Sequence, residues 1–117
     1  MVWNELASAD PERALRFYGE LFGWTFEPFE LPGGRYWVAR HGDRMVGGIG
    51  GLDTGPAGTT ASSWICWVGV DDVDASVVTA VAAGGQIIEA ACDVPEVGRV
   101  ATIRDPAGAI IGLLQGL

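Results

Sequence analysis

The apolar and polar positions of this chain repeat with two different periods, and the period changes from segment to segment. Residues 2–9 form a short segment in which apolar and polar residues partly alternate, which is typical of a strand. Residues 11–22 instead carry apolar side chains at helical spacing. Asp10 precedes them as a candidate N-cap, and Gly23 follows as a left-handed stop. The pattern predicts a strand followed by an amphipathic helix.

Three more apolar runs follow this helix, and turn-forming residues separate them. The predicted strands are Trp24–Phe29, Arg35–Arg40 and Arg44–Gly51. Residues 53–61 are rich in Gly, Thr and Ala and lack an apolar pattern, so they predict a linker. The first half therefore reads as strand, helix and three strands.

The second half repeats this order. The predicted elements are a strand Trp64–Val70, a helix that starts after Asp71-Asp72 and stops before Gly84-Gly85, and strands Gln86–Ala90, Arg99–Ile103 and Ala109–Leu114. Matching the helix starts gives an offset of 62 residues, and matching the helix ends gives 61. A slip of one residue would exchange the two faces of every strand. We use 62 for the strands before the helices.

Length and composition fit one folded domain. The chain has 117 residues, of which 49% are hydrophobic and 19% charged. We expect a single α+β domain with one module at residues 1–52, the linker at 53–61, and a second module at 62–117.

The net charge of −8 disfavours binding to nucleic acid or to an anionic membrane surface, because both carry negative charge. No window approaches the length of a membrane-spanning segment, and the N-terminus does not read as a signal peptide. We therefore expect a cytoplasmic protein without nucleic acid or membrane partners.

Neither the two cysteines nor the histidine lies in a pattern typical of a disulfide framework or a metal site. Cys66 lies in an apolar strand-like run and Cys92 in a loop-like stretch, without the number or spacing of a disulfide framework or a zinc site. We expect both to be reduced structural thiols. His41 lies in Arg40-His41-Gly42-Asp43, which predicts the solvent-facing tip of a hairpin.

Several short motifs, taken in order, resemble glyoxalase and bleomycin-resistance proteins of the vicinal oxygen chelate superfamily. They are Trp3-Asn4-Glu5-Leu6, Asp10, Phe17-Tyr18 and Leu21-Phe22-Gly23-Trp24 in the first half, and Val70-Asp71-Asp72-Val73-Asp74, Gly84-Gly85 and Asp105-Pro106-Ala107-Gly108 in the second. The resemblance covers essentially the whole chain. It implies two βαβββ modules whose sheets form a cup, which is usually completed in a homodimer and holds a small molecule.

In catalytic members of that superfamily, the resemblance also implies a metal held by His or Glu on the first and last strands of each module. The corresponding positions here are Trp3, Ile65 and Gly112, and the strand Arg44–Leu52 has no Asp, Glu, His or Cys in any register. We expect neither a metal nor another cofactor.

Alternation places Trp3, Glu5 and Ala7 on one strand face, and the 62-residue offset places Ile65, Trp67 and Gly69 on the matching face. The residues that we expect to contact a ligand are Trp3, Glu5, Trp37, Met45, Ile65, Trp67 and Gly112. Tyr36 and Trp37 are adjacent, so only one of them can face the cup, and the sequence does not say which. The tryptophans can equally be core residues.

Glu5 is a carboxylate among apolar residues, so it needs a partner, a raised pKa or contact with water. It could serve as a catalytic acid or base, hold a cationic or hydroxyl-bearing ligand, or accept bonds from the backbone or from an arginine such as Arg35 or Arg44. The expected function is metal-free binding of a small, largely apolar or aromatic molecule. Two alternatives remain: a lyase, isomerase or dioxygenase-like enzyme that uses Glu5 or an atypical metal site, and a non-catalytic dimeric interaction domain.

Overall fold

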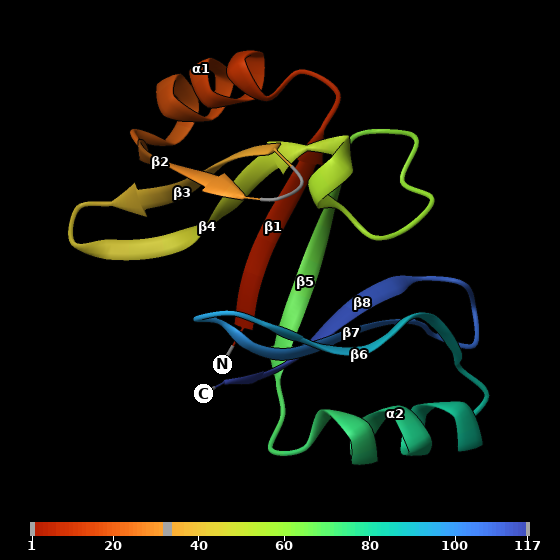
Figure 1. The fold of residues 1–117 in the computed structure, drawn as a ribbon. Helices are drawn as coiled ribbons and strands as arrows, with labels where there is room; N and C mark the ends of the chain where they lie inside the picture. Colours follow the sequence, from red (N-terminus) through yellow and green to blue (C-terminus); the bar gives the residue numbers. More distant parts are fainter. Residues whose placement is uncertain (1, 32–33, 117) are drawn as a thin grey trace. The chain divides into compact units, whose positions relative to one another are not determined.

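The computed structural model describes residues 2–31 and 34–116. Contacts along the chain group the described residues into two compact units. The first unit comprises residues 3–64, and the second comprises residues 65–116 together with Val2. Each unit contains one helix and most of four strands, as Figure 1 shows.

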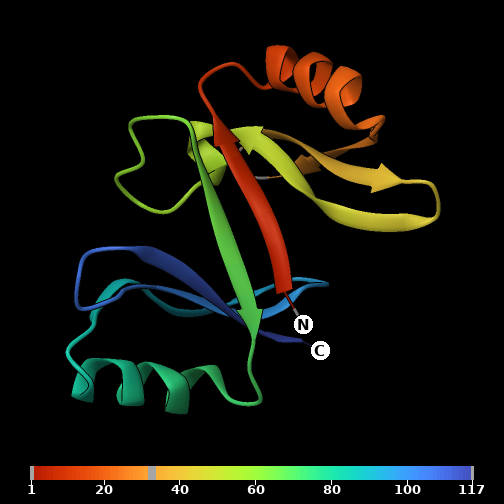
Figure 2. The ribbon, with the colours of Figure 1, turned by 180° about the vertical axis from the view of Figure 1, so that it is seen from behind.

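The first unit contains one helix and a four-stranded sheet. Its elements are β1 (Val2–Ser8), α1 (Pro11–Phe22), β2 (Thr25–Leu31), β3 (Gly34–His41), β4 (Arg44–Gly51) and a short 3₁₀ turn η1 (Leu52–Thr54). The strands lie in the order β2-β3-β4-β1, with β4 parallel to β1 and the other neighbours antiparallel. Helix α1 lies along one side of the β2, β3 and β4 strands in both Figure 1 and Figure 2.

The second unit repeats this arrangement. Its elements are β5 (Ser63–Gly69), α2 (Val73–Ala82), β6 (Gln86–Val94), β7 (Gly98–Arg104) and β8 (Ile110–Gly116). The order is β5-β8-β7-β6, with β5 parallel to β8 and the other pairs antiparallel. The predicted α+β class with two βαβββ modules is confirmed.

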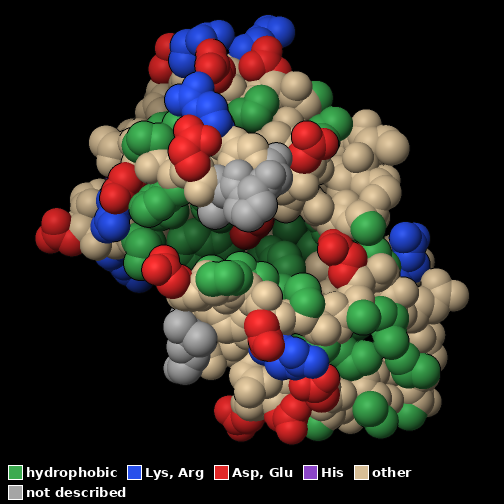
Figure 3. All heavy atoms as spheres, in the orientation of Figure 1, with side chains coloured by type: hydrophobic (Ala, Val, Ile, Leu, Met, Phe, Trp, Pro, Cys, Tyr) green, Lys and Arg blue, Asp and Glu red, His purple; other side chains and the backbone are tan. Residues whose placement is uncertain are grey.

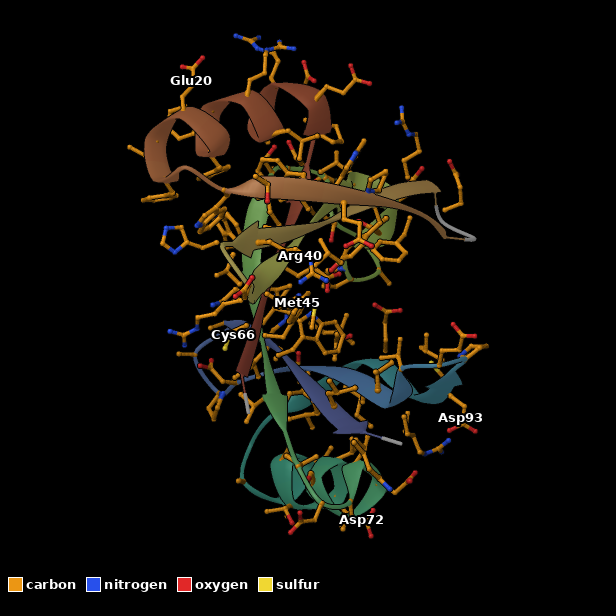
Figure 4. All side chains as sticks on the ribbon, turned by 90° about the vertical axis from the view of Figure 1, so that its left-hand side faces the viewer. Glu20, Arg40, Met45, Cys66, Asp72 and Asp93 are labelled. Carbon is orange, nitrogen blue, oxygen red and sulfur yellow. The ribbon has the colours of Figure 1, made fainter. Side chains whose placement is uncertain are left out.

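The two helices begin in the same way. The Asp10 carboxylate accepts a hydrogen bond from the Arg13 N–H at 3.2 Å, and Asp72 accepts one from the Ala75 N–H at 3.1 Å. Figure 4 shows Asp72 at the start of α2. These bonds satisfy N–H groups that have no partner within the helix. The offset of 62 residues is confirmed at the helix starts.

We expect Asp72→Ala to lower the free energy of unfolding by about 1 kcal/mol, because the first turn of α2 loses its cap. Urea unfolding measures this change. Asp71→Ala is the matched control, since it removes the same charge from the exposed neighbouring position. Equal losses in the two variants would show that the effect comes from charge and not from capping.

Each unit buries apolar side chains from alternate positions of its strands. In the second unit the core consists of Val73, Ala101, Ile103 and Leu113. Because successive strand residues point to opposite faces, Thr102 and Gly112 lie on the other face of that sheet. In the first unit, Leu6 and Ile49 are almost fully buried, with 5% and 0% of their surface exposed.

Beyond small shifts in strand ends, the structure differs from the sequence-based expectation at β6, in the linker and on α1. Strand β6 continues to Val94, so Cys92 lies in a strand and not in a loop, because residues 92–94 pair with β7. The expected linker opens with η1. In the predicted apolar stripe of α1, Leu21 and Phe22 are 57% and 48% exposed.

The predicted hairpin tip is confirmed. His41 is the exposed last residue of β3, and it pairs with Arg44 across a turn in which Gly42 adopts a positive φ of 62°. Cys66 and Cys92 are both free thiols.

Acidic side chains are spread over the face of the molecule drawn in Figure 3 and do not gather in one patch. Among the described residues, no helix is both long enough and apolar enough to cross a membrane.

Candidate functional site

One face of the first unit's sheet carries Glu5. The register pairs Glu5 of β1 with Gly48 of β4, and Gly48 with Val38 of β3. Directly paired residues point to the same face, and so do residues two positions apart on a strand. Tyr36 lies two residues from Val38, so its side chain shares the face of Glu5.

The glycine at position 48 makes room for the Tyr36 ring. A Cβ atom at Gly48 would overlap the Tyr36 hydroxyl and would lie 2.9 Å from the Cε1 atom of the ring. Without that Cβ, the phenol can lie across β4 toward β1. A glycine within a strand thus allows the close approach of a neighbouring ring at this position.

Trp3, Glu5 and Tyr36 form a hydrogen-bonded group, here called the Glu5 cluster. The Trp3 Nε1–H donates to the Tyr36 hydroxyl at 3.2 Å. The Tyr36 hydroxyl also donates to the Glu5 carboxylate, and the single Trp3 N–H is shared between the Tyr36 hydroxyl and that carboxylate. Arg35, which was one expected structural partner of Glu5, instead pairs with Glu12 at 3.6 Å.

Burial is the largest influence on the pKa values of Glu5 and Tyr36. Loss of water raises the pKa of Glu5 above its ordinary value, while the hydrogen bonds from Tyr36 and Trp3 act in the opposite direction. Burial, followed by the nearby Glu5 charge, raises the pKa of Tyr36, so its hydroxyl keeps its proton. The cluster thus joins a carboxyl that takes up a proton more readily than usual to a neutral phenol.

This arrangement has two chemical uses. The carboxylate has about four acceptor sites on its two oxygens, so it can accept a hydrogen bond from a ligand hydroxyl or amine in addition to those from Tyr36 and Trp3. A carboxyl whose pKa is raised also takes up a proton from a bound molecule more readily than an ordinary carboxyl does. Both uses need a ligand that lies against this face of the sheet.

Trp37 does not belong to the Glu5 cluster. Alternation turns it to the opposite face, where it is 7% exposed and the Arg35 guanidinium lies 4.9 Å from its ring centroid. There it lines an open hollow of about 430 Å³ beside the start of α1. Tyr36, which the sequence left undecided, takes the place beside Glu5.

Met45 is not part of the Glu5 cluster either. It is 58% exposed and pairs with Arg40, next to a break in the register between Ala39 and Arg40.

The remaining predicted ligand contacts lie in the second unit. Trp67 of β5 pairs directly with Gly112 of β8, and a Cβ at Gly112 would lie 2.7 Å from the Cζ3 atom of the Trp67 ring. The indole therefore covers Gly112. Ile65 lies two residues before Trp67 on the same strand and is 7% exposed.

The donor set does not fit the metal site of the superfamily's catalytic members. Trp3, Ile65 and Gly112 provide no nitrogen, oxygen or sulfur ligand from their side chains, and the Trp67 ring covers Gly112. Across the described parts of the chain, three or more His, Cys, Asp or Glu side chains nowhere gather closely enough to hold a metal ion.

A comparison with curated proteins finds relatives at substantial identity. The chain is 40% identical over 116 residues to the putative glyoxylase CFP32 of Mycobacterium tuberculosis, with 98% of this chain and 43% of that protein covered. It is 33% identical to the anthracycline biosynthesis protein DnrV of Streptomyces peucetius, with 98% and 48% covered. The chain thus spans less than half the length of these relatives.

Solved structures share the fold. A glyoxalase/bleomycin resistance protein/dioxygenase superfamily member from Vibrio splendidus matches with a TM-score of 0.68 and 17% identity, covering 100% of this chain and 98% of that one. Methylmalonyl-CoA epimerase from Mycobacterium tuberculosis matches with a TM-score of 0.65 and 17% identity, covering 97% and 85%. At such identities the likeness concerns the fold alone.

The family model described as a glyoxalase-like domain matches residues 3–114, which is nearly the whole chain. This protein is a member of the glyoxalase-like domain family.

Proposed function

We propose that the chain binds a small, largely apolar or aromatic molecule against the sheet face that carries the Glu5 cluster, without a metal ion. The observation that carries the proposal is the Glu5 carboxylate, which is largely buried, has no cationic partner among the described residues and receives its hydrogen bonds from Trp3 and Tyr36. A carboxylate in such a setting can select a ligand that donates a hydrogen bond, while the aromatic rings supply apolar contact.

The relatives support a role with small molecules. One is named a putative glyoxylase and another an anthracycline biosynthesis protein. We also expect the chain to form a homodimer in the cytoplasm.

Calorimetric titration with 1-naphthol and with naphthalene tests the proposal. The two probes share an aromatic body, but only naphthol offers a hydroxyl donor. We expect wild type to bind naphthol more tightly than naphthalene, and Glu5→Gln to reduce naphthol affinity about tenfold, because a hydrogen bond to a charged group contributes about 1.5 kcal/mol or more. Naphthalene affinity should hardly change.

Glu20→Gln is the matched control, because Glu20 lies on α1 and points away from the sheet in Figure 4. It should leave the affinity of both probes unchanged. If neither probe binds wild type, or if both bind wild type and Glu5→Gln equally well, the proposed site is wrong.

We expect this binding to be independent of metal ions, since the superfamily's metal positions lack ligand side chains. Dialysis against EDTA should leave naphthol affinity unchanged, and elemental analysis should find far less than one Zn, Ni, Fe or Mn per chain. A metal-to-chain ratio near one, with affinity lost on dialysis and restored by that metal, would contradict the proposal.

A second candidate is an enzyme in which Glu5 acts as a general base, and the raised pKa of Glu5 favours it. Such a base would remove a proton next to a carbonyl group and return one from solvent. The corresponding measurement is deuterium exchange at the methyl group of acetophenone in D₂O, followed by NMR. Exchange accelerated by wild type and lost in Glu5→Gln, with probe affinity retained, would favour the enzyme over the binding protein.

A further inference from the structure

The Trp67 indole leaves a polar atom without a partner. Its Nε1 atom is shielded from solvent and makes no hydrogen bond to any of the described residues. A buried donor of this kind is rare in native proteins, because leaving it unpaired costs about 1–3 kcal/mol. Two tryptophans within residues 3–64 contrast with it, since the Trp3 and Trp64 Nε1–H groups donate to Tyr36 and Tyr18 at 3.2 and 3.1 Å.

Trp67 cannot easily turn away to find a partner. Its ring lies over Gly112, where a Cβ atom would come within 2.7 Å of Cζ3. The register continues from Gly112 to Thr102 of β7 and from Thr102 to Glu89 of β6, so these residues form one row across the four strands of the second unit. Because Gly112 has no side chain, the Trp67 indole occupies the space above it.

The charge along this row restricts what could pair with the indole. An indole N–H can only donate, so its partner must be an acceptor. The Thr102 hydroxyl donates to the Glu89 carboxylate at 3.4 Å, which places a negative charge in the same row. The net charge of −8 of the chain would repel an anionic acceptor.

We propose that the Trp67 Nε1–H is a ligand-binding group that donates a hydrogen bond to a neutral oxygen, such as a ketone or ether oxygen, of a small molecule held against the sheet of the second unit. This inference rests on the proposed function, because it concerns a residue expected to contact the same class of ligand. It assigns to the second unit a binding group for a carbonyl or ether oxygen of such a ligand.

Acetophenone and ethylbenzene are the probes, since they differ mainly in the carbonyl oxygen. We expect wild type to bind acetophenone more tightly than ethylbenzene in calorimetric titration. Trp67→Phe should reduce acetophenone affinity about three- to tenfold, the range for one hydrogen bond between neutral groups, and should leave ethylbenzene nearly unchanged. Trp64→Phe is the matched control, because the Trp64 indole already has Tyr18 as its acceptor.

Wild type provides a second readout that does not depend on how well a variant folds. The indole N–H resonance of Trp67, assigned by its absence in Trp67→Phe, should move downfield with acetophenone and stay in place with ethylbenzene. If both probes bind and this resonance responds to neither, the inference is overturned while the proposed function stands. Rapid solvent exchange of this N–H without ligand would also overturn it, by showing that water is its partner. Failure of wild type to bind any of the aromatic probes would overturn both.

Discussion

Gly48→Ala should destabilise the protein by about 3 kcal/mol. The new Cβ atom would overlap the hydroxyl of Tyr36, so the phenol must leave its place over β4. Overpacking of this kind typically costs 1–3 kcal/mol. Displacing Tyr36 also removes one of the hydrogen bonds to the partly buried Glu5 carboxylate, which adds the cost of an unsatisfied polar group. Urea unfolding measures the loss.

Gly51→Ala is the control for this substitution within the same strand. A Cβ at position 51 would meet only the Cγ atom of Pro11, at 4.0 Å, which is an ordinary contact. Both variants remove the same glycine freedom from the unfolded chain, so their difference isolates the clash with Tyr36. If Gly48→Ala is as stable as Gly51→Ala, then Tyr36 does not lie over Gly48 and the Glu5 cluster is wrongly described.

Glu5→Gln should change how stability depends on pH. Burial raises the pKa of Glu5 in the folded chain above its ordinary value of 4.5. The folded chain then holds the proton more tightly than the unfolded chain. This contribution to stability is fully present below pH 4.5 and is lost as the pH rises through the folded-state pKa. The stability of wild type relative to Glu5→Gln should therefore fall as the pH rises from 4.5.

The expected loss is about 1.4 kcal/mol for each tenfold difference in proton affinity between the folded and unfolded chains. It is measured by urea unfolding of both proteins across the pH range. Asp74 and Asp105, whose pKa values are lowered, shift stability in the opposite sense at acid pH, but equally in both proteins. The stability of Glu20→Gln should depend on pH in the same way as that of wild type. A difference between wild type and Glu5→Gln that is constant with pH would show that Glu5 is not buried.

The arrangement of helices and strands could be predicted because local signals marked their ends. Asp10 and Asp72 cap the helices as expected, and Gly23 ends α1 with a φ of 72°. The end of β6 could not be predicted in this way. Residues 92–94 have no alternating pattern, and their strand conformation comes from pairing with β7, where Arg99 contacts Asp93 at 3.1 Å.

The candidate site could be predicted only in part. Alternation correctly put Trp3 and Glu5 on one face, but it could not choose between Tyr36 and Trp37, because the register of β3 against β4 depends on tertiary pairing. A signal for Tyr36 was present in the glycines of β4, since a missing side chain next to an aromatic strand leaves space for a ring. The sequence could not indicate that the Trp67 N–H lacks a hydrogen-bond acceptor, because this depends on the three-dimensional positions of the neighbouring atoms.

The central claim is that an aromatic molecule binds against the Glu5 cluster without a metal. The most direct measurement is a titration of wild type with 1-naphthol in EDTA, followed through the tryptophan indole N–H resonances, with Trp3 and Trp64 assigned by Trp3→Phe and Trp64→Phe. Trp64 provides the internal comparison, since its indole is bound to Tyr18 on α1. The account predicts a saturable shift of the Trp3 resonance at one ligand per chain, with little change at Trp64. An unmoved Trp3 resonance at full saturation, or a shift that appears only when a metal is added, would contradict it.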